Sequence, residues 1–472
     1  MSVKKIDDTD AAKYTFELMR QARAAQKIAE GFSQEKVDEL VTAIMWEIIA
    51  KDDVVKELSE FSLNEIKLGD VPSKISKLSN KCRGLLRDIR HEKTVGVVEE
   101  IPEKGLSRIT KPVGVIGSLV PSTQPEMTPI MQAMCAVKAR DAIVFAPHPR
   151  GKKTTCKTVE LIRAVMKKYG APEDLFIAIP DPSVEKTNEL MKQCDLIIAT
   201  GGSPMVKAAY SSGTPAFGVG AGNSNIVVDK TADLDDAAAK IKASKTFDLA
   251  AGCSCDNSVI IQEDVYDAMI TAFKKVGACL VPPEKKADVQ KAIWPNFPKD
   301  HVINRDIVAQ PAEIIAKLAN LAIPKDTSLF LVEETGSGEE YPFSGEKMCL
   351  VITIYKYKTI EDAIRIINAN QAYSGAGHSC GIFSKTPENI EKVSLGTYTT
   401  RVVVNQPQAA TNTGSWTSGM PFTCSLGCGT WGGNIASENI ALKHFMNNTW
   451  VIREIPYHGV KDDELFKGFR PR

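Results

Sequence analysis

The sequence has no excess of charge of either sign. Its 58 lysines and arginines are matched by 58 aspartates and glutamates, so the net charge at pH 7 is zero. Proteins that bind nucleic acid or an anionic membrane surface usually carry a basic excess. The composition therefore gives no support to either class of partner.

Long apolar runs are also missing. No segment approaches the ~20 apolar residues that a membrane helix needs, and no apolar stretch follows the lysines of the N-terminal segment MSVKKIDDTDAAKY. The 11 cysteines are odd in number and scattered, which is typical of reduced thiols. The sequence has no pair of CxxC motifs, and no histidine lies near its closely spaced cysteines, so no metal site is indicated. We therefore expect a cytoplasmic protein with no secretory signal, no membrane span and no metal.

The length of the sequence indicates two large domains, because 472 residues are more than a single hydrophobic core usually accommodates. The first ~90 residues read as helices. Ser33 can cap a helix whose apolar positions 37, 40, 41, 44 and 48 follow helical spacing. Residues 94–112 predict a β-hairpin that turns at Glu103, Lys104 and Gly105.

Short apolar runs then alternate with helical stretches, which predicts parallel strands and an α/β fold. A first set of expected strands comprises 113–120, 142–147, 195–200 and 225–229. A second set comprises 258–263, 328–334, 350–357, 380–384 and 401–406. Ligands bind at the carboxyl ends of such strands, so the loops at Pro121, Pro147 and Gly201 should converge on one crevice.

Two glycine-rich segments could lie against a ligand. Thr200-Gly201-Gly202-Ser203-Pro204 joins an expected strand to a helix, where backbone N–H groups can face an anion. The segment 218–223, GVGAGN, precedes an expected strand instead of following one, so the dinucleotide fingerprint does not apply. A tight turn in the first case and an irregular turn in the second explain the glycines equally well.

Two cysteine-containing segments are further candidates. Cys253 lies between the small residues Gly252 and Ser254, which leave its sulfur accessible, although most cysteines are merely small buried groups. Residues 422–434 hold four glycines, two cysteines and a tryptophan. Such density predicts a loop shaped around a ligand or around another backbone segment.

Taken together, these segments resemble the aldehyde dehydrogenase superfamily and, more narrowly, its CoA-acylating branch. The resemblance covers nearly the whole chain, and its landmarks follow the family's order. They are PVGVIGSLVPSTQP (112–125), APHPRGKK (146–153), ATGGSPMVKAAYSSG (199–213), GVGAGN (218–223), SKTFD with Cys253, GEKMCLV (345–351), GAGHS (375–379) and SLGCGTWGGN (425–434).

The resemblance implies an aldehyde dehydrogenase-like α/β fold in three parts. A Rossmann-like cofactor domain would comprise 1–93 and 113–235, and a second α/β domain, 236–435, would carry the nucleophile. Residues 94–112 and 436–472 would form a small β arm and a C-terminal segment for assembly as a homodimer or homotetramer.

The same resemblance implies covalent catalysis at Cys253. The thiol would attack an aldehyde, with the oxyanion held by the Cys253 N–H and a side chain near Thr123. NAD or NADP would accept the hydride, and coenzyme A would remove the acyl group. Hydrolytic members of the family carry a glutamate base where this chain has Val219, and a thiol needs such a base less than water does.

For the dinucleotide, the resemblance implies contacts along the first expected strand and at several loops. These residues are Gly117, Ser118, Leu119, Val120, Pro121, Ser122, His148, Thr200, Gly201, Gly202, Gly220, Glu346 and Leu426. Glu346 would hold the nicotinamide ribose. Arg150, Lys152 and Lys153 could meet a 2′-phosphate or simply begin a solvated helix, so both NAD and NADP stay open.

The substrate and the remaining residues leave alternatives. The stretch 405–423 most resembles sulfoacetaldehyde dehydrogenases, with Arg401 as a candidate for the sulfonate, while acetaldehyde and succinate semialdehyde remain open. We expect His378 to be structural or near CoA rather than catalytic, and Cys255 and Cys428 to pack as small residues. Competing interpretations are a hydrolytic aldehyde dehydrogenase, a phosphorylating semialdehyde dehydrogenase and a non-catalytic protein that retains the fold.

Overall fold

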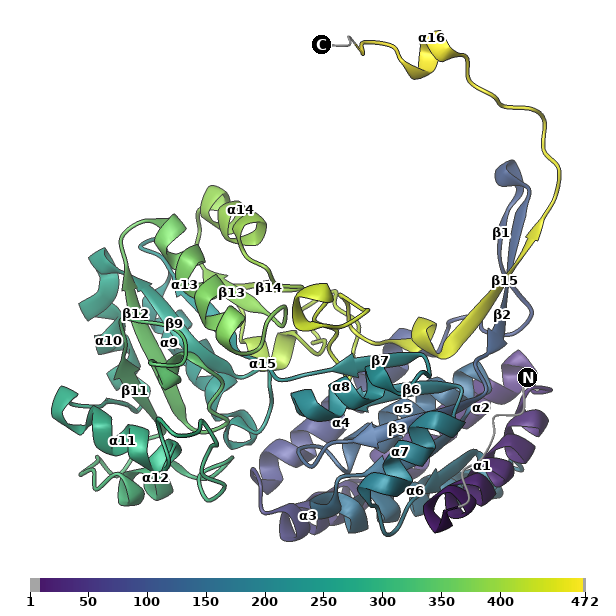
Figure 1. Cartoon of the computed structure of the whole chain (residues 1–472), viewed down its shortest axis with the longest axis horizontal. Coiled ribbons are helices and arrows are strands. Elements are labelled where there is room, and N and C mark those ends of the chain that lie inside the picture. Colours follow the sequence, from purple (N-terminus) through teal and green to yellow (C-terminus); the bar gives the residue numbers. More distant parts are fainter. Residues whose placement is uncertain (1–8, 470–472) are drawn as a thin grey trace.

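The protein is built from two α/β bodies and a slender β arm. The structure, a computed structural model, describes residues 9–469, so the start of the N-terminal segment discussed above lies outside the described residues. Each body surrounds one parallel sheet, and the arm projects away from both (Figure 1). The α/β architecture expected from the alternating pattern is confirmed.

The first body holds a five-stranded parallel sheet in the order β5-β4-β3-β6-β7. Its strands are β3 (Val115–Val120), β4 (Ala142–Pro147), β5 (Phe176–Ala178), β6 (Leu196–Thr200) and β7 (Ala216–Val219). Its helices are α1 (Asp10–Ala29), α2 (Gln34–Ile44), α3 (Asp52–Ile66), α4 (Val71–Ile89), α5 (Met127–Ala139), α6 (Lys152–Lys168), α7 (Val184–Gln193) and α8 (Ser203–Ser211).

The cap expected at Ser33 is confirmed. The Ser33 side chain accepts a hydrogen bond from the Lys36 N–H at 3.3 Å and begins α2. The α-helix gives way to a π-helical turn, η1 (Met45–Ile49), after Ile44. All the apolar positions predicted for this helix are buried, Ile48 within η1 included.

The second body holds a seven-stranded parallel sheet in the order β10-β11-β12-β9-β8-β13-β14. Its strands are β8 (Ser224–Val228), β9 (Asp256–Gln262), β10 (Ala278–Leu280), β11 (Leu329–Glu333), β12 (Val351–Tyr357), β13 (Cys380–Phe383) and β14 (Val402–Val404). Its helices are α9 (Leu234–Thr246), α10 (Tyr266–Lys275), α11 (Lys286–Ile293), α12 (Ala312–Leu318), α13 (Ile360–Tyr373), α14 (Pro387–Gly396) and α15 (Gln408–Thr411).

Single turns of 3-10 helix connect many of these elements. They are η2 (Pro102–Lys104), η3 (Pro149–Gly151), η4 (Glu173–Leu175), η5 (Phe247–Ala250), η6 (Glu263–Val265), η7 (Pro283–Lys285), η8 (Pro342–Ser344), η9 (Thr430–Gly432) and η10 (Leu442–Phe445). Among the helices of residues 9–469, none combines the length and apolar character that a membrane crossing requires.

One strand lies in a different sheet from the one its sequence position indicated. The run at 225–229 was expected with the first set, but β8 pairs with β9 and β13 in the second sheet. An apolar run predicts burial but not which strands lie beside it. The segment GVGAGN was expected to precede a strand and not to follow one. In the structure it also follows one, because β7 ends at Val219.

The expected hairpin is present and extends into a three-stranded sheet. Strands β1 (Val97–Ile101) and β2 (Leu106–Pro112) pair antiparallel, and β15 (Met446–Ile452) adds to β2 from the far end of the chain. Beyond β15 the chain arches away from the body to α16 (Asp462–Leu465) (Figure 1). Every residue from 456 to 469 is exposed.

Late residues also return to the core of the first body. Phe422, Ile440, Leu442 and Phe445 are buried in the same apolar cluster as β3, β4 and α5. In between, the Gly427 carbonyl accepts hydrogen bonds from Arg401, which directly precedes β14 of the second sheet. The glycine-rich loop of 422–434 therefore contacts both bodies.

Candidate active site

The carboxyl ends of the first sheet open onto a cavity of ≈ 340 Å³. Residues that follow β3, β4, β6 and β7 form one wall, as expected for ligand sites on parallel sheets. This wall contains Val120, Pro121, Ser122, His148, Thr200, Gly201, Gly202 and Gly220. Thr123, Cys253, Glu346 and Leu426 complete the set of expected site residues that line the cavity.

Three residues expected along the cofactor do not line this cavity. Gly117, Ser118 and Leu119 lie inside β3 and are packed in the core. A Cβ added to Gly117 would lie 2.9 Å from the Cys194 sulfur, so this glycine serves the packing of α7 on the sheet. Only the end of β3, from Val120 onward, reaches the cavity.

The Cys253 thiol is held against a histidine from the second body. His378 Nε2 lies 3.3 Å from Cys253 Sγ, and His378 Nδ1 lies 2.9 Å from the Ser379 hydroxyl. The same hydroxyl accepts a hydrogen bond from Asn412 at 3.0 Å. The contact brings together two residues 125 positions apart, one after η5 and one before β13.

Burial keeps both members of this pair uncharged in the resting protein. It raises the pKa of Cys253 to about 12, and the negative charge of Glu346 acts in the same direction. Burial also lowers the pKa of His378 to about 3, with a further contribution from nearby Arg401. A neutral His378 can accept a hydrogen bond from the thiol through Nε2 while Nδ1–H donates to Ser379.

Glu346 is the second titratable group of the cavity wall. Burial raises its pKa to about 7, while the Gly222 N–H and the charges of Lys245 and Lys347 oppose the rise. Its carboxyl group is close enough to Cys253 to affect the thiol electrostatically. The wall therefore holds a carboxyl group that can change protonation near neutral pH.

The segment before Cys253 has an unusual backbone. Asp248, Leu249 and Ala250 have φ angles of 49°, 52° and 66°, a left-handed run without glycine. Such a conformation costs about 1–2 kcal/mol per residue for L-amino acids. Surrounding contacts must therefore hold this turn in place.

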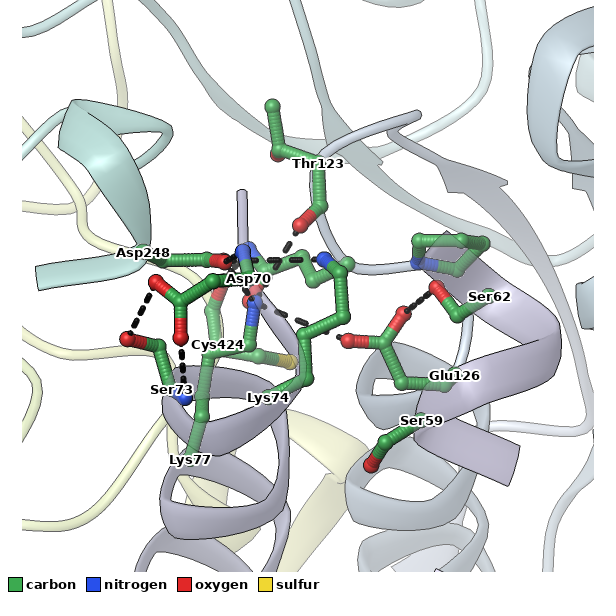
Figure 2. A network of polar contacts seen from close by, with 12 residues as sticks. Ser59, Ser62, Asp70, Ser73, Lys74, Lys77, Thr123, Glu126, Asp248 and Cys424 are labelled. Atoms are coloured by element: carbon green, nitrogen blue, oxygen red, sulfur yellow. Dashed lines mark hydrogen bonds and ion pairs between the residues drawn. The ribbon is translucent and has the colours of Figure 1, made fainter. Parts of the chain in front are cut away.

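A buried ionic network supplies those contacts (Figure 2). The Asp248 carboxylate accepts hydrogen bonds from Lys77 Nζ at 2.9 Å and from the Asp70 N–H at 3.2 Å. Lys74 Nζ lies 3.7 Å from the same carboxylate. Although burial opposes ionisation, Lys77 and Lys74 together lower the pKa of Asp248.

Lys77 joins this turn to the loop that follows β3. Its ammonium group also donates to the Thr123 carbonyl at 3.2 Å and pairs with Glu126 at 3.6 Å. Glu126 in turn accepts a hydrogen bond from Ser62 of α3. One α4 lysine therefore fixes the Thr123 loop relative to the turn that precedes Cys253.

Glycines allow the remaining loops to approach the nucleophile closely. A Cβ on Gly222 would lie 2.1 Å from the Cys253 carbonyl oxygen, so no side chain fits there. At Gly377, φ is +78° and a Cβ would lie 1.9 Å from the Cys428 carbonyl oxygen. The glycines of these loops thus serve backbone-to-backbone packing around Cys253.

Comparison with known proteins supports the interpretation of this geometry. The sequence model of the aldehyde dehydrogenase family matches residues 3–290. A sulfoacetaldehyde dehydrogenase from an Acholeplasma species is 42% identical, over 95% of this chain and 92% of its own. A succinate-semialdehyde dehydrogenase (acetylating) from Clostridium kluyveri is 41% identical, over 91% and 94%. The chain belongs to the aldehyde dehydrogenase family.

Solved structures agree with this assignment. An acetylating aldehyde dehydrogenase from Geobacillus thermoglucosidasius superposes with a TM-score of 0.91 at 33% identity, covering 96% of this chain and 98% of that one. A Rhodopseudomonas palustris propionaldehyde dehydrogenase with bound propionyl-CoA has a TM-score of 0.82 at 25% identity, over 93% and 94%. The family resemblance and the fold inferred from sequence are thereby confirmed.

In this aldehyde dehydrogenase the wall of the cavity that contains Cys253 is apolar at Val219. Val219 is buried and lines the cavity at the end of β7. The carboxylates that line the cavity are Asp248 and Glu346. Asp248 is bound to two lysines, which leaves Glu346 as the carboxyl group without a lysine ion pair in the described cavity wall.

Arg401 occupies a different position from the one its expected substrate role requires. It is buried, donates two hydrogen bonds to the Gly427 carbonyl at 2.9 and 2.6 Å, and is not among the residues that line the cavity. Its guanidinium group stabilises the loop that carries Cys428. Cys428 is buried, and so is Cys255.

The histidine and basic residues near the end of β4 have local partners. His148 lines the cavity and also caps η3 by accepting a hydrogen bond from the Arg150 N–H at 3.1 Å. Lys152 pairs with Asp181 at 3.1 Å. In residues 9–469, no group of three or more His, Cys, Asp and Glu side chains could hold a metal ion.

Sequence reasoning missed several residues of the site. Lys77, Lys81 and Asp248 line the cavity, and His378 contacts the nucleophile directly. GAGHS had singled out His378, but its distance from Cys253 in the chain hid the contact. The α4 lysines follow helical spacing at 74, 77 and 81, and three lysines on one helical face normally indicate a solvated surface.

Proposed function

We propose that this protein is a CoA-acylating aldehyde dehydrogenase that oxidises a short aldehyde with NAD or NADP as hydride acceptor. The observation that carries the proposal is the contact between Cys253 and His378 in a cavity that Val219 also lines. Val219 stands where hydrolytic members of the family carry a glutamate base, and the lack of that base favours a thiol over water as the deacylating nucleophile. This argues for acyl transfer and against the hydrolytic alternative.

The chemistry follows from the residues around the thiol. His378 Nε2 accepts the Cys253 proton as the sulfur attacks the aldehyde carbon, giving a thiohemiacetal. The Cys253 N–H and the Thr123 side chain stabilise the oxyanion, and a well-placed donor of this kind contributes ~3–4 kcal/mol. The wall at the strand ends would hold the dinucleotide, whose nicotinamide would supply the hydride acceptor for that carbon. The resulting Cys253 thioester is cleaved by the CoA thiolate, which restores the thiol.

The cofactor assignment uses the wall at the strand ends. Val120, Pro121, Ser122, Thr200 and the neighbouring glycines offer backbone groups to the dinucleotide, and Glu346 holds its ribose. We assign 1–93 and 113–235 to dinucleotide binding and 236–435 to catalysis. Strand β8 belongs to the first of these assignments by its position in the chain, but it lies in the second sheet. Arg150 and Lys153 lie in η3 and at the start of α6, where basic side chains can meet a 2′-phosphate, so both NAD and NADP stay open.

For the substrate we favour sulfoacetaldehyde, with succinate semialdehyde and acetaldehyde as alternatives. The support is the stretch 405–423 and the similarity to the two relatives described above. Free thiols throughout the chain favour a reducing, cytoplasmic location. The β arm and the exposed residues after it favour a homodimer or homotetramer.

Absorbance at 340 nm tests the proposal. Purified protein is mixed with an aldehyde panel and either dinucleotide, with and without CoA, and the acyl-CoA product is identified by mass. We expect reduction that requires CoA and disappears in Cys253→Ala. Cys255→Ala is the matched control, because this buried thiol lies two residues away and has no proposed role.

The opposite results are equally informative. Steady turnover without CoA would mean that water deacylates the enzyme, and the argument from Val219 would then be wrong. Full activity in Cys253→Ala would remove the proposed nucleophile. Absence of dinucleotide binding would favour a non-catalytic protein.

A further inference from the structure

Three lysines of α4 are buried on one face of the helix. Lys74, Lys77 and Lys81 are spaced by three and four residues, which stacks them along the same side. Two acidic groups, Asp248 and Glu126, pair with the first two of these lysines (Figure 2). Two negative charges thus face three positive ones in this part of the protein.

Lys81 is the lysine without a counter-charge. In the described part of the chain it makes no ion pair; its ammonium donates to the carbonyl oxygens of Ala410 at 2.8 Å and Gly414 at 2.6 Å. The ring of Phe422 lies 5.5 Å away. An ammonium has three N–H donors, so one remains beyond these two bonds.

Burial of an unpaired ammonium is unfavourable, because no counter-charge offsets its loss of hydration. Burial lowers its pKa to about 7, and no neighbouring charge opposes that change. Lys77, one turn earlier, keeps a raised pKa because Asp248 and Glu126 outweigh the effect of burial. An anion beside Lys81 would restore the balance of charge.

Lys81 also lines the cavity that contains Cys253. It does so together with Ala409 and Thr413, which flank its carbonyl partners. We propose that Lys81 binds the anionic group of the substrate, so that the enzyme selects short aldehydes that carry a sulfonate or carboxylate. This inference rests on the proposed function and replaces the role expected for Arg401.

The position of Lys81 distinguishes the substrate from the phosphates of the cofactors. The proposed dinucleotide contacts lie at the ends of β3, β4, β6 and β7, whereas Lys81 is bonded to the segment 410–414 after α15. Catalysis brings the aldehyde, and not a phosphate, next to Cys253. Because Lys81 lines the same cavity as Cys253, we assign the anion that meets it to the substrate.

The test compares one anionic and one neutral aldehyde in the same enzyme. The ratio of kcat/KM for sulfoacetaldehyde to kcat/KM for propionaldehyde is measured with saturating dinucleotide and CoA. We expect Lys81→Met to lower this ratio roughly 10- to 100-fold, as for loss of one hydrogen bond to a charged group. Lys81→Arg keeps the cation, and we expect it to recover most of the ratio.

Arg87→Met is the matched control on the same helix. Arg87 also stacks on the Phe422 ring, at 4.9 Å, but does not line the cavity. We expect it to leave the ratio within about threefold of wild type, since the residues it contacts, Phe422, Trp416 and Asp88, do not line the cavity. Circular dichroism of each variant verifies that the fold is retained.

Other outcomes would overturn the inference. An equal loss of kcat/KM on both aldehydes in Lys81→Met would mean a structural role. A raised KM for CoA or dinucleotide at unchanged aldehyde ratio would assign Lys81 to a cofactor phosphate. If wild type forms no acyl-CoA from any aldehyde, the proposed function fails; if it does and the ratio is unchanged, only the anion site fails.

Discussion

The reactive sulfur and its histidine partner are two neutral groups that must exchange a proton during attack. The 3.3 Å contact between Cys253 and His378 provides the path for this transfer. Burial disfavours both charged forms, the Cys253 thiolate and the His378 imidazolium. The resting pair is therefore unreactive toward weak electrophiles. The site therefore depends on bound ligands to favour the ionised state.

This property predicts how the free enzyme responds to alkylation. Because the pKa of Cys253 is raised to about 12, the thiolate fraction rises throughout the accessible pH range. We expect inactivation by iodoacetamide, without cofactors, to accelerate about tenfold per pH unit from pH 7 to 9.5. The measurement is loss of activity over time at each pH.

Mass spectrometry of the modified protein provides the control for this experiment. Cys156 and Cys279 are also partly exposed, so their labelling must be separated from that of Cys253. A plateau of the inactivation rate below about pH 9 would contradict a raised pKa. It would indicate that His378 or another group stabilises the thiolate in the free enzyme.

At the scale of elements, the left-handed turn of η5 depends on the network that joins it to α4. Asp248→Asn removes one partner of a buried ion pair while it preserves the shape of the side chain. We expect it to lower the free energy of unfolding by about 3–5 kcal/mol, since Lys77 is left with only Glu126. Urea unfolding monitored by fluorescence measures the change.

A matched control comes from an exposed pair. Lys275 and Asp235 are 2.9 Å apart at the surface, and we expect Asp235→Asn to cost less than about 1 kcal/mol. Equal effects of the two substitutions would argue against a structural role for the buried network. Since the pKa of Asp248 is lowered, its stabilising contribution should also be lost as the pH falls.

The elements show how far sequence reasoning extends. Runs such as 142–147 and 350–357 predicted their strands because continuous apolar character indicates burial on both faces. The sequence did not predict the short strands β5, β7 and β10, since three or four residues carry little periodicity. The sheet that contains β8 could not be inferred, because strand neighbours are set by tertiary packing.

For the site, local motifs located Cys253, Glu346 and the loops but not the relations between them. The contact of His378 with the thiol spans 125 residues. The difference between Lys77 and Lys81 is invisible in sequence, because it depends on acidic groups from other parts of the chain. Charge partners across such distances require the folded structure.

At the scale of the whole molecule, the segment after β15 is the least covered part of the described chain. It carries exposed apolar side chains, among them Leu465, Phe466 and Phe469 on and after α16. A second copy of the chain would cover them, as the proposed assembly implies. We expect the triple variant L465S, F466S and F469S to shift the oligomer toward monomer in light scattering coupled to gel filtration.

Leu395→Ser is the control for this experiment. Leu395, on α14, is also an exposed apolar residue, but it lies outside the arm and the segment after it. We expect its oligomeric state to match that of wild type. A monomeric wild-type protein at micromolar concentration, or an unchanged oligomer in the triple variant, would contradict the role proposed for this segment.

An uncovered C-terminal segment also links folding to mass action. If association covers those side chains, dilution favours the dissociated chain. The free energy of unfolding then falls with the logarithm of the protein concentration. The melting temperature of such a protein is then a property of the solution as well as of the sequence. At a low cellular concentration this enzyme would therefore be less stable.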